Sequence, residues 1–209
     1  MFPFGGNPDR GFTPTAERAD FAAMGRNVVS SLQERDTKLR HRIFAAAALL
    51  VLPFAAARAA DVPQIGQAAP EFSLPSQEGG PVSLKDFRGQ WVVLYFYPKD
   101  MTPGCTIEAH NFQRDLSQYQ DKHAVILGVS VDSTDSHKEF CTKESLTFKL
   151  LSDTDKKMVG QYGSLGPHGV ASRNTFLIDP AGKVARVWTG VSPAKPSEEV
   201  LAALPDAGQ

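Results

Sequence analysis

The chain has 209 residues, and 42% of them are hydrophobic, a proportion typical of a soluble globular protein. The formal net charge is −1, which excludes the strong positive field of a nucleic-acid or acidic-lipid binder. The two cysteines are too few for a disulfide-stapled mini-domain, so they are a redox pair, one structural bridge or two unrelated core residues.

The N-terminal part of the chain is predicted to lie outside the folded domain. Residues 1–42 have too little apolar content to fold alone, and we expect a disordered extension. The apolar run IFAAAALLVLPFAAA at 43–57 follows basic residues and ends in a small-x-small site at 57–59, a pattern typical of a secretory signal peptide. The run is shorter than the ~20 residues of a transmembrane helix, and it has no polar face like that of a core helix. The sequence therefore predicts a signal peptide at 43–59.

Export would place the mature protein in the periplasm if the source is a Gram-negative bacterium. Membrane anchoring and a plastid transit peptide are the alternatives, although transit peptides avoid the acidic residues that occur here. A translation start at Met24 would shorten the leader. Cleavage would leave 60–209 as a single domain with 14 Lys and Arg against 18 Asp and Glu, which argues further against a nucleic-acid partner.

Strands are predicted from apolar runs and turn residues. The segment 71–84 indicates a short hairpin that turns at Gly79-Gly80. WVVLYFYP at 91–98 and AVILGVSVD at 124–132 are continuous apolar runs, as in strands buried on both faces of a sheet. RNTFLIDPAGKVARVWTG at 173–190 indicates a second hairpin around a Pro-Ala-Gly turn.

Helices are expected at 103–119, from Asp135 or Ser136 onward, near 155–162 and near 196–204. SHKE at 136–139 fits a capping box for the second of them. Strands that alternate with helices and end in a hairpin predict an α/β protein with a mixed sheet.

The segment YPKDMTPGCTIEAH, at 97–110, places Cys105 just after a buried strand. Thr102 suits the N-cap and Pro103 the first helical position, so Cys105 falls in the first turn, where free N–H groups and the helix dipole favour an anion. Gly104 would let a substrate approach the backbone. Ligands bind at this edge of α/β sheets, so a reactive thiolate is favoured over a small apolar core residue.

These residues resemble the peroxiredoxin family. Pro98, Thr102 and Cys105 match its Pro-x-x-x-Thr-x-x-Cys pattern, and YPKDMTPGCTIEA is similar to the bacterioferritin comigratory protein, or peroxiredoxin Q, branch. The resemblance continues through GVSVDSTDSHKEF, LLSD and RNTFLIDPAGKV, from about Gly66 to Leu204. It implies a thioredoxin-like fold with a central mixed β-sheet flanked by helices and an N-terminal β-hairpin.

The resemblance implies a thiol-dependent peroxidase that reduces hydrogen peroxide and organic hydroperoxides. Cys105 would be the peroxidatic cysteine, oxidised to a sulfenic acid. Thr102 would hydrogen-bond the thiolate and the peroxide, Arg173 would hold both, and Pro98 would shield the sulfur from water. Each of these residues has an alternative role: Pro98 could simply end a strand, Thr102 could simply cap a helix, and Arg173 could lie at the surface.

The second cysteine is at an uncommon place for this branch. Many members carry it five residues after the first, where this chain has His110. Some carry it on the next helix, as Cys141, and the resemblance then implies an intramolecular Cys105–Cys141 disulfide that a thioredoxin-like donor recycles. The alternative is a one-cysteine enzyme in which Cys141 is a core residue beside Phe140.

We expect no cofactor and no metal site. The histidines lack metal-ligand spacing and are predicted to face solvent or lie in loops: His41, His110, His123, His137 and His168. The expected partners are a hydroperoxide and a thiol reductant, and the mature domain is expected to be a monomer without stable membrane insertion. Two other functions stay open. One is an exported thioredoxin-like thiol-disulfide oxidoreductase, although that class normally needs Cys-x-x-Cys and Cys105 is followed by Thr106, Ile107 and Glu108. The other is a non-catalytic redox-sensing module on the same fold.

Overall fold

The structure is a computed structural model that describes residues 61–206. The predicted extension at 1–42 and signal peptide at 43–59 lie outside the described residues. Within 61–206, no helix has both the length and the hydropathy that crossing a bilayer requires.

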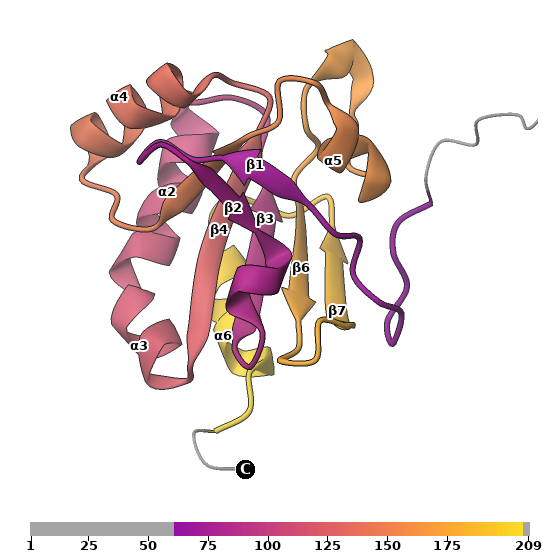
Figure 1. Ribbon diagram of the computed structural model, residues 1–209. Coiled ribbons are helices and arrows are strands. Elements are labelled where there is room, and N and C mark those ends of the chain that lie inside the picture. Colours follow the sequence, from indigo (N-terminus) through magenta and orange to yellow (C-terminus); the bar gives the residue numbers. More distant parts are fainter. Residues whose placement is uncertain (1–60, 207–209) are drawn as a thin grey trace, which may run out of the picture. The chain divides into compact units, whose positions relative to one another are not determined.

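A five-stranded mixed sheet forms the centre of the domain (Figure 1). The strand order is β5-β4-β3-β6-β7, with β3, β4 and β5 parallel and with β6 antiparallel to both of its neighbours. The strands are β3 (Trp91–Phe96), β4 (Ala124–Ser130), β5 (Lys149–Ser152), β6 (Asn174–Ile178) and β7 (Val184–Thr189). The central strand β3 is buried from Val92 to Phe96, as its continuous apolar run predicts.

Helices cover one face of this sheet, and the N-terminal hairpin lies across the other together with a short helix (Figure 1). The helical face carries α2 (Pro103–Arg114), α3 (Leu116–Asp121), α4 (Thr134–Glu144) and α6 (Pro196–Ala203). The hairpin face carries β1 (Ser73–Pro75), β2 (Pro81–Ser83), the 3-10 helix η1 (Leu84–Phe87) and α5 (Lys157–Gln161); a second 3-10 turn, η2, spans Pro167–Gly169. This is the predicted α/β, thioredoxin-like architecture with its N-terminal hairpin.

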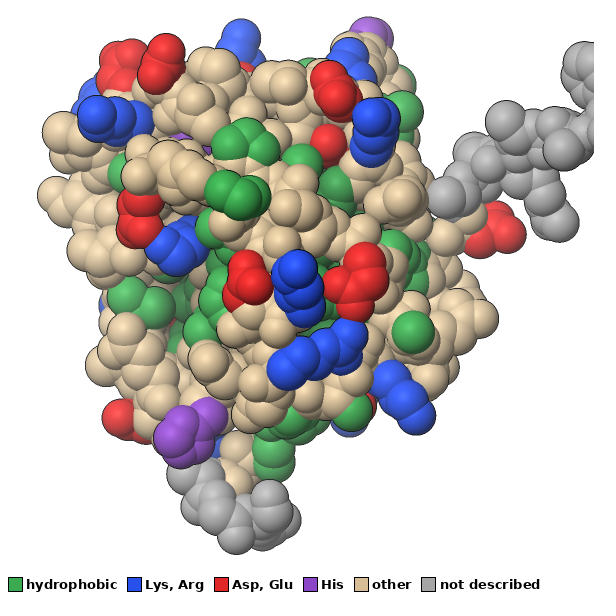
Figure 2. Space-filling view, in the orientation of Figure 1, with side chains coloured by type: hydrophobic (Ala, Val, Ile, Leu, Met, Phe, Trp, Pro, Cys, Tyr) green, Lys and Arg blue, Asp and Glu red, His purple; other side chains and the backbone are tan. Residues whose placement is uncertain are grey.

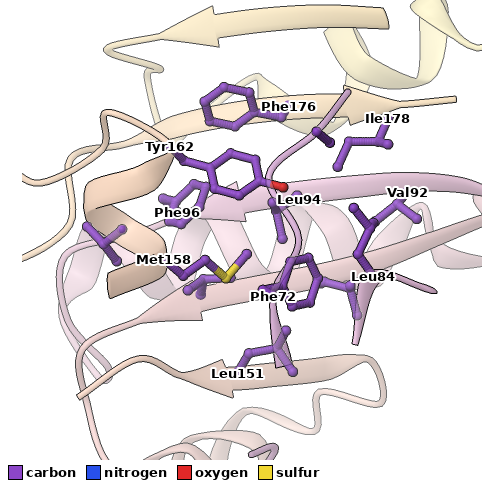
Figure 3. Close-up of a cluster of buried hydrophobic side chains, with 14 of the residues drawn as sticks. Phe72, Leu84, Val92, Leu94, Phe96, Leu151, Met158, Tyr162, Phe176 and Ile178 are labelled. Carbon is purple, nitrogen blue, oxygen red and sulfur yellow. The ribbon is translucent and has the colours of Figure 1, made fainter. Parts of the chain in front are cut away.

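Each face of the sheet has its own apolar core. On the hairpin side, Phe72 and Leu84 pack against the strands with Met158 of α5 and with Tyr162, which follows that helix (Figure 3). The core on the helical side includes both cysteines. Lys and Arg side chains are interspersed with Asp and Glu over the face that Figure 2 shows, rather than gathered by sign.

The structure differs from the predicted elements at three places. The helix expected at 103–119 is broken at Asp115, whose carboxylate accepts a 2.8 Å hydrogen bond from Ser197 at the start of α6. Strand β5 has only four residues and was not predicted. The helix expected from 135 or 136 begins at Thr134, because the N-cap is Ser133, whose hydroxyl accepts from the backbone N–H of Ser136, and not the capping box at 136–139.

Candidate active site

Cys105 lies where the sequence places it, in the first turn of α2 just beyond the end of β3. Thr102 is the N-cap residue by its backbone, with φ −87° and ψ 146°, and Pro103 begins the helix. The Cys105 side chain is buried, with 1% of its surface exposed. Its sulfur therefore sits beside the free N–H groups of a helix start in a site that excludes most water.

Arg173 reaches this sulfur from another part of the fold. It directly precedes β6, which pairs with β3, and its carbonyl accepts a 2.9 Å hydrogen bond from the backbone N–H of Val191. Its Nη2 donates to Cys105 Sγ at 3.2 Å, and its Nη1 donates to the carboxylate of Glu108. The structure thus brings together Cys105 and Arg173, the two residues on which the predicted chemistry depends most.

Gly104 is required by this approach of Arg173. A Cβ atom at position 104 would lie 2.8 Å from Arg173 Nη2 and 3.7 Å from Pro193 Cγ. The first of these distances is shorter than real Cβ contacts, so any other residue would displace the guanidinium. The sequence interpretation assigned Gly104 to the approach of a substrate, whereas the close neighbour in the structure is Arg173.

Glu108 is a site residue that the sequence reasoning missed. Its side chain is 1% exposed and forms an ion pair with Arg173 through Oε2. Burial raises the pKa of Glu108 to about 7, although Arg173 acts to lower it. Its Oε1 has no hydrogen-bond partner within the described part of the chain. A signal was available, since Glu108 follows Cys105 by three residues on the same helix and so shares its face.

The neighbours of Arg173 stabilise the charged form of its guanidinium. Burial alone would lower the pKa of Arg173, but Glu108 and Cys105 outweigh that effect and the pKa is raised. A permanently charged guanidinium with several donors can bind a thiolate and a second anionic or polar oxygen together. The arrangement is suited to stabilising negative charge at sulfur and at a substrate oxygen.

Pro98 and Thr102 lie in the loop between β3 and α2, next to the cysteine in sequence. Both are partly buried. The Thr102 hydroxyl donates to the carbonyl of Lys99 at 2.9 Å and does not cap the helix. This leaves its oxygen lone pairs as acceptors. The shielding role of Pro98 and the contact of Thr102 with sulfur and peroxide stay predictions.

Cys141 lies on α4, and neither cysteine is in a disulfide. Its side chain is buried, and burial raises its pKa to about 11, with smaller contributions from the charges of Asp100 and Glu78. Cys105 and Cys141 belong to the same apolar core under α2 and α4. A thiol with that pKa is a poor nucleophile at neutral pH, so Cys141 is unreactive while α4 is packed.

Tyr95 of β3 is buried beside this core, and its hydroxyl has no hydrogen-bond partner among residues 61–206. Its ring stacks on Phe112 of α2 with the ring centroids 4.7 Å apart. Burial first, and then the nearby charges of Glu108, Cys141 and Cys105, raise the pKa of Tyr95 well above its ordinary value. The hydroxyl is thus neutral at physiological pH, in the same apolar core as both cysteines.

The prediction for His137 is wrong. The sequence predicts that it faces solvent or lies in a loop, but it is fully buried on α4 and pairs with Asp100. The contacts that bury it come from distant positions and could not be read from local pattern. His110, at the position where many branch members have a cysteine, is half-exposed and pairs with Glu144 at 3.0 Å. In the region from 61 to 206, no group of three or more His, Cys, Asp or Glu side chains could hold a metal ion.

The sequence matches the AhpC/TSA family over residues 65–187. It is 44% identical over 135 residues to a putative peroxiredoxin Bcp of Coxiella burnetii, which covers 61% of this chain and 89% of the relative. It is 39% identical over 150 residues to peroxiredoxin Bcp of Bacillus subtilis, covering 68% of this chain and 96% of the relative.

Solved structures of Xanthomonas campestris peroxiredoxin Q, or bacterioferritin comigratory protein, share this fold. They superpose with a TM-score of 0.63 at 36% or 37% identity, and cover 68% of this chain and 95% or 96% of theirs. One is described in connection with alkyl peroxide reduction activity and trapped intermediates. Two others are cysteine-to-serine variants, at positions 48 and 84 of that protein.

Proposed function

The chain belongs to the AhpC/TSA family, in its Bcp/peroxiredoxin Q branch, and we propose that it reduces hydroperoxides at Cys105 and forms a disulfide with Cys141 in each cycle. Membership makes it a thiol-dependent peroxidase of the peroxiredoxin type. The observation that carries the role of Cys105 is the 3.2 Å hydrogen bond to its sulfur from Arg173 Nη2, at the start of α2.

The first step transfers an OH unit from the peroxide to sulfur. The Cys105 thiolate attacks the terminal oxygen of ROOH, an S–O bond forms as the O–O bond breaks, and the electrons of the broken bond leave with RO⁻. A proton converts RO⁻ to an alcohol, or to water when the substrate is hydrogen peroxide. Arg173 holds the thiolate and stabilises the negative charge that develops on the leaving oxygen. Thr102 and Pro98 take the positioning and shielding roles predicted for them.

In the second step Cys141 resolves the sulfenic acid. Its thiolate attacks the Cys105 sulfur, the S–S bond forms, the S–O bond breaks, and the hydroxide leaves as water after protonation. The separation of the two cysteines supports this route: Cys105 and Cys141 are 36 positions apart, as are the two cysteine positions replaced in the Xanthomonas campestris protein. The apolar core that the two cysteines share also supports this route, because the reaction then requires opening of only the segments packed over that core.

A dithiol donor of the thioredoxin type then supplies two electrons and two protons and restores both thiols. Alkyl hydroperoxides and hydrogen peroxide are the proposed substrates, and the alkyl peroxide activity described for the Xanthomonas campestris protein supports the first of these. We propose that the domain works as a monomer. A mass in solution twice that of one chain, by light scattering, would contradict this.

Export is part of the same proposal. A signal peptide at 43–59 would be cleaved after Ala59, which gives a mature N-terminus near Ala60 and a periplasmic or otherwise exported enzyme. N-terminal sequencing of protein from the native host tests it. Intact chain that begins at Met1 and stays in the cytosol would contradict export.

The test of the activity is peroxide consumption by the purified protein with a thioredoxin and its reductase. Turnover is expected for the native protein and none for Cys105→Ser, because a serine hydroxyl stays protonated and is a poor nucleophile. Arg173→Ala should slow oxidation of Cys105 by ~10²–10³. Peptide mass mapping after one equivalent of peroxide should give a linked Cys105–Cys141 peptide. Turnover by Cys105→Ser, or a free Cys141 beside an oxidised Cys105, would contradict the respective assignment.

A further inference from the structure

A buried polar cluster joins the helix that carries Cys141 to the loop that leads to Cys105. Asp100 lies in that loop, between β3 and α2, and its side chain is 2% exposed. The hydroxyl of Ser136 in the first turn of α4 donates to Asp100 Oδ2 at 2.7 Å, and His137 Nδ1 lies 2.8 Å from the same oxygen. Tyr97 donates to the other oxygen, Oδ1, at 2.7 Å. The cluster thus spans both cysteine-bearing segments.

His137 joins this cluster through both of its ring nitrogens. Its Nδ1 faces the Asp100 carboxylate, and its Nε2 lies 3.2 Å from the carbonyl oxygen of Leu151 on β5. The carboxylate and the carbonyl only accept, so both ring nitrogens are placed to donate hydrogen bonds. The ring is fully buried, so its contact with the Asp100 carboxylate is shielded from water.

The Asp100 side of the pair is also held in place. Its backbone N–H donates to Asp132 Oδ2 at 2.9 Å, and that oxygen accepts a second hydrogen bond from Ser130 at 2.8 Å. Burial would raise the pKa of Asp100, but the bonds from His137, Tyr97 and Ser136 outweigh it and the pKa is lowered. Asp100 is therefore a fixed anion to which the first turn of α4 is attached.

In the proposed resolving step α4 opens. Cys141 is buried and unreactive in the packed helix, and its sulfur forms no bond with the buried Cys105 sulfur. A disulfide needs Cα atoms within about 7 Å and sulfurs that reach each other, so on the proposed route the two buried segments open from their packed positions. Separating α4 from the 97–102 loop breaks the contacts of Ser136 and His137 with Asp100.

We propose that Asp100 and His137 act as a latch, a pair of positioning residues that keeps the Cys141 helix closed and sets the rate of the resolving step. This inference rests on the proposed role of Cys141. Opening only one segment would leave a buried charge without its partner, which is strongly unfavourable. The latch therefore couples release of the Cys105 loop to release of α4, so that the two cysteines become free together.

Weakening the latch should speed disulfide formation without affecting the attack on peroxide. In His137→Gln, the Cys105–Cys141 disulfide should form about fivefold faster or more, equivalent to ~1 kcal/mol of easier opening. Ser136→Ala removes one hydrogen bond from the same cluster and should give a smaller increase, of about twofold to fivefold. The second-order rate of Cys105 oxidation should stay within about twofold of the native value in both variants.

The rates are measured by rapid quenching with an alkylating reagent after one equivalent of peroxide, followed by mass mapping. Two further readouts separate a latch from a loss of general stability. Excess peroxide should convert less Cys105 to sulfinic acid per turnover in the variants, because the sulfenic acid lives for a shorter time. In the reduced variants, amide hydrogen exchange across 134–144 should be faster than in the reduced native protein, whereas exchange across α5 should not change.

Tyr162→Phe is the matched control. It removes a partly buried 2.8 Å hydrogen bond to the carbonyl of Pro70 on the opposite face of the sheet, and the resolving rate should not change. A native protein that forms no Cys105–Cys141 disulfide would overturn the proposed resolving route and the latch together. A disulfide that forms in the native protein at the same rate as in folded His137→Gln and Ser136→Ala would overturn the latch alone. If His137→Gln does not fold, the comparison of the resolving rates of Ser136→Ala and Tyr162→Phe tests the latch.

Discussion

Arg173 Nη2 lies 3.2 Å from Cys105 Sγ, and the space for this contact exists because residue 104 has no side chain. The thiol and the guanidinium come from segments 68 positions apart in the chain. They meet because β6 pairs with β3, so that Arg173 arrives at the edge of the sheet where α2 begins. The site is thus fixed by strand pairing on one side and by a glycine on the other.

Gly104→Ala should impair catalysis more than folding. The added Cβ would lie 2.8 Å from Arg173 Nη2, so the guanidinium must shift away from the sulfur. We expect the rate of Cys105 oxidation to fall by about tenfold to a hundredfold, less than for complete loss of the donor. Stopped-flow oxidation of the reduced protein by hydrogen peroxide measures it.

Gly160→Ala is the control for this substitution. Gly160 lies in α5, and a Cβ there would meet nothing within 4 Å. Alanine is the better helix former, so this variant should be as stable as the native protein or more so, with unchanged oxidation. Equal oxidation rates for Gly104→Ala and the native protein would show that Arg173 does not need its observed position.

Glu108 should make stability depend on pH. Burial raises its pKa from 4.5 to about 7, so the folded state favours the protonated acid. The stability this provides is full below about pH 4.5 and is lost as the pH rises through about 7, by about 3 kcal/mol in all. Glu108→Gln removes this loss, so the variant should gain stability relative to the native protein between pH 5 and pH 8.

Urea unfolding of the reduced proteins at several pH values tests this expectation. Glu199→Gln is the matched control, because Glu199 is exposed on α6 and its substitution should leave the pH profile as it is. A difference in the free energy of unfolding between native protein and Glu108→Gln that stays constant from pH 5 to pH 8 would contradict the raised pKa.

Much of the fold could be predicted because its signals are local. Continuous apolar runs identified β3 and β4, a Pro-Ala-Gly turn identified the β6–β7 hairpin, and Thr102-Pro103 identified the start of α2. Strand β5 gave no such signal, since it has four residues and only Leu150 and Leu151 are apolar. At the break between α2 and α3, Asp115 accepts a hydrogen bond from Ser197, 82 positions away, a contact that no local pattern contains.

The candidate site divides in the same way. Cys105 could be placed from helix-start chemistry alone, whereas Arg173 entered only through the resemblance to peroxiredoxins. Glu108 was missed although it shares a helix face with Cys105. The burial of His137 could not be foreseen, because its partners Asp100, in the loop between β3 and α2, and Leu151, on β5, lie 37 and 14 positions away.

Tyr95→Phe should leave the protein as stable as before or stabilise it by up to about 2 kcal/mol. The Tyr95 hydroxyl is buried without a hydrogen-bond partner in the described region, so its removal relieves a desolvation penalty. Tyr162→Phe should instead lose about 1 kcal/mol, because the Tyr162 hydroxyl donates to the carbonyl of Pro70 at 2.8 Å. Urea titrations of the two variants measure both. A loss of stability in Tyr95→Phe as large as that in Tyr162→Phe would indicate a bound partner, such as an ordered water.

Alkylation of Cys141 should report how firmly α4 is closed. Its pKa of about 11 arises first from burial and then from the charges of Asp100 and Glu78. At pH 8.5 only about one thiol in three hundred is then ionised, and in urea, where the pKa returns to an ordinary ~8.5, about half are. We therefore expect iodoacetamide to label Cys141 of the reduced native protein at least about a hundredfold more slowly than in urea, with a rate that rises about tenfold per pH unit. Labelling at the urea rate in the native protein would mean that α4 is open without oxidation, and that Cys141 needs no conformational change to resolve the sulfenic acid.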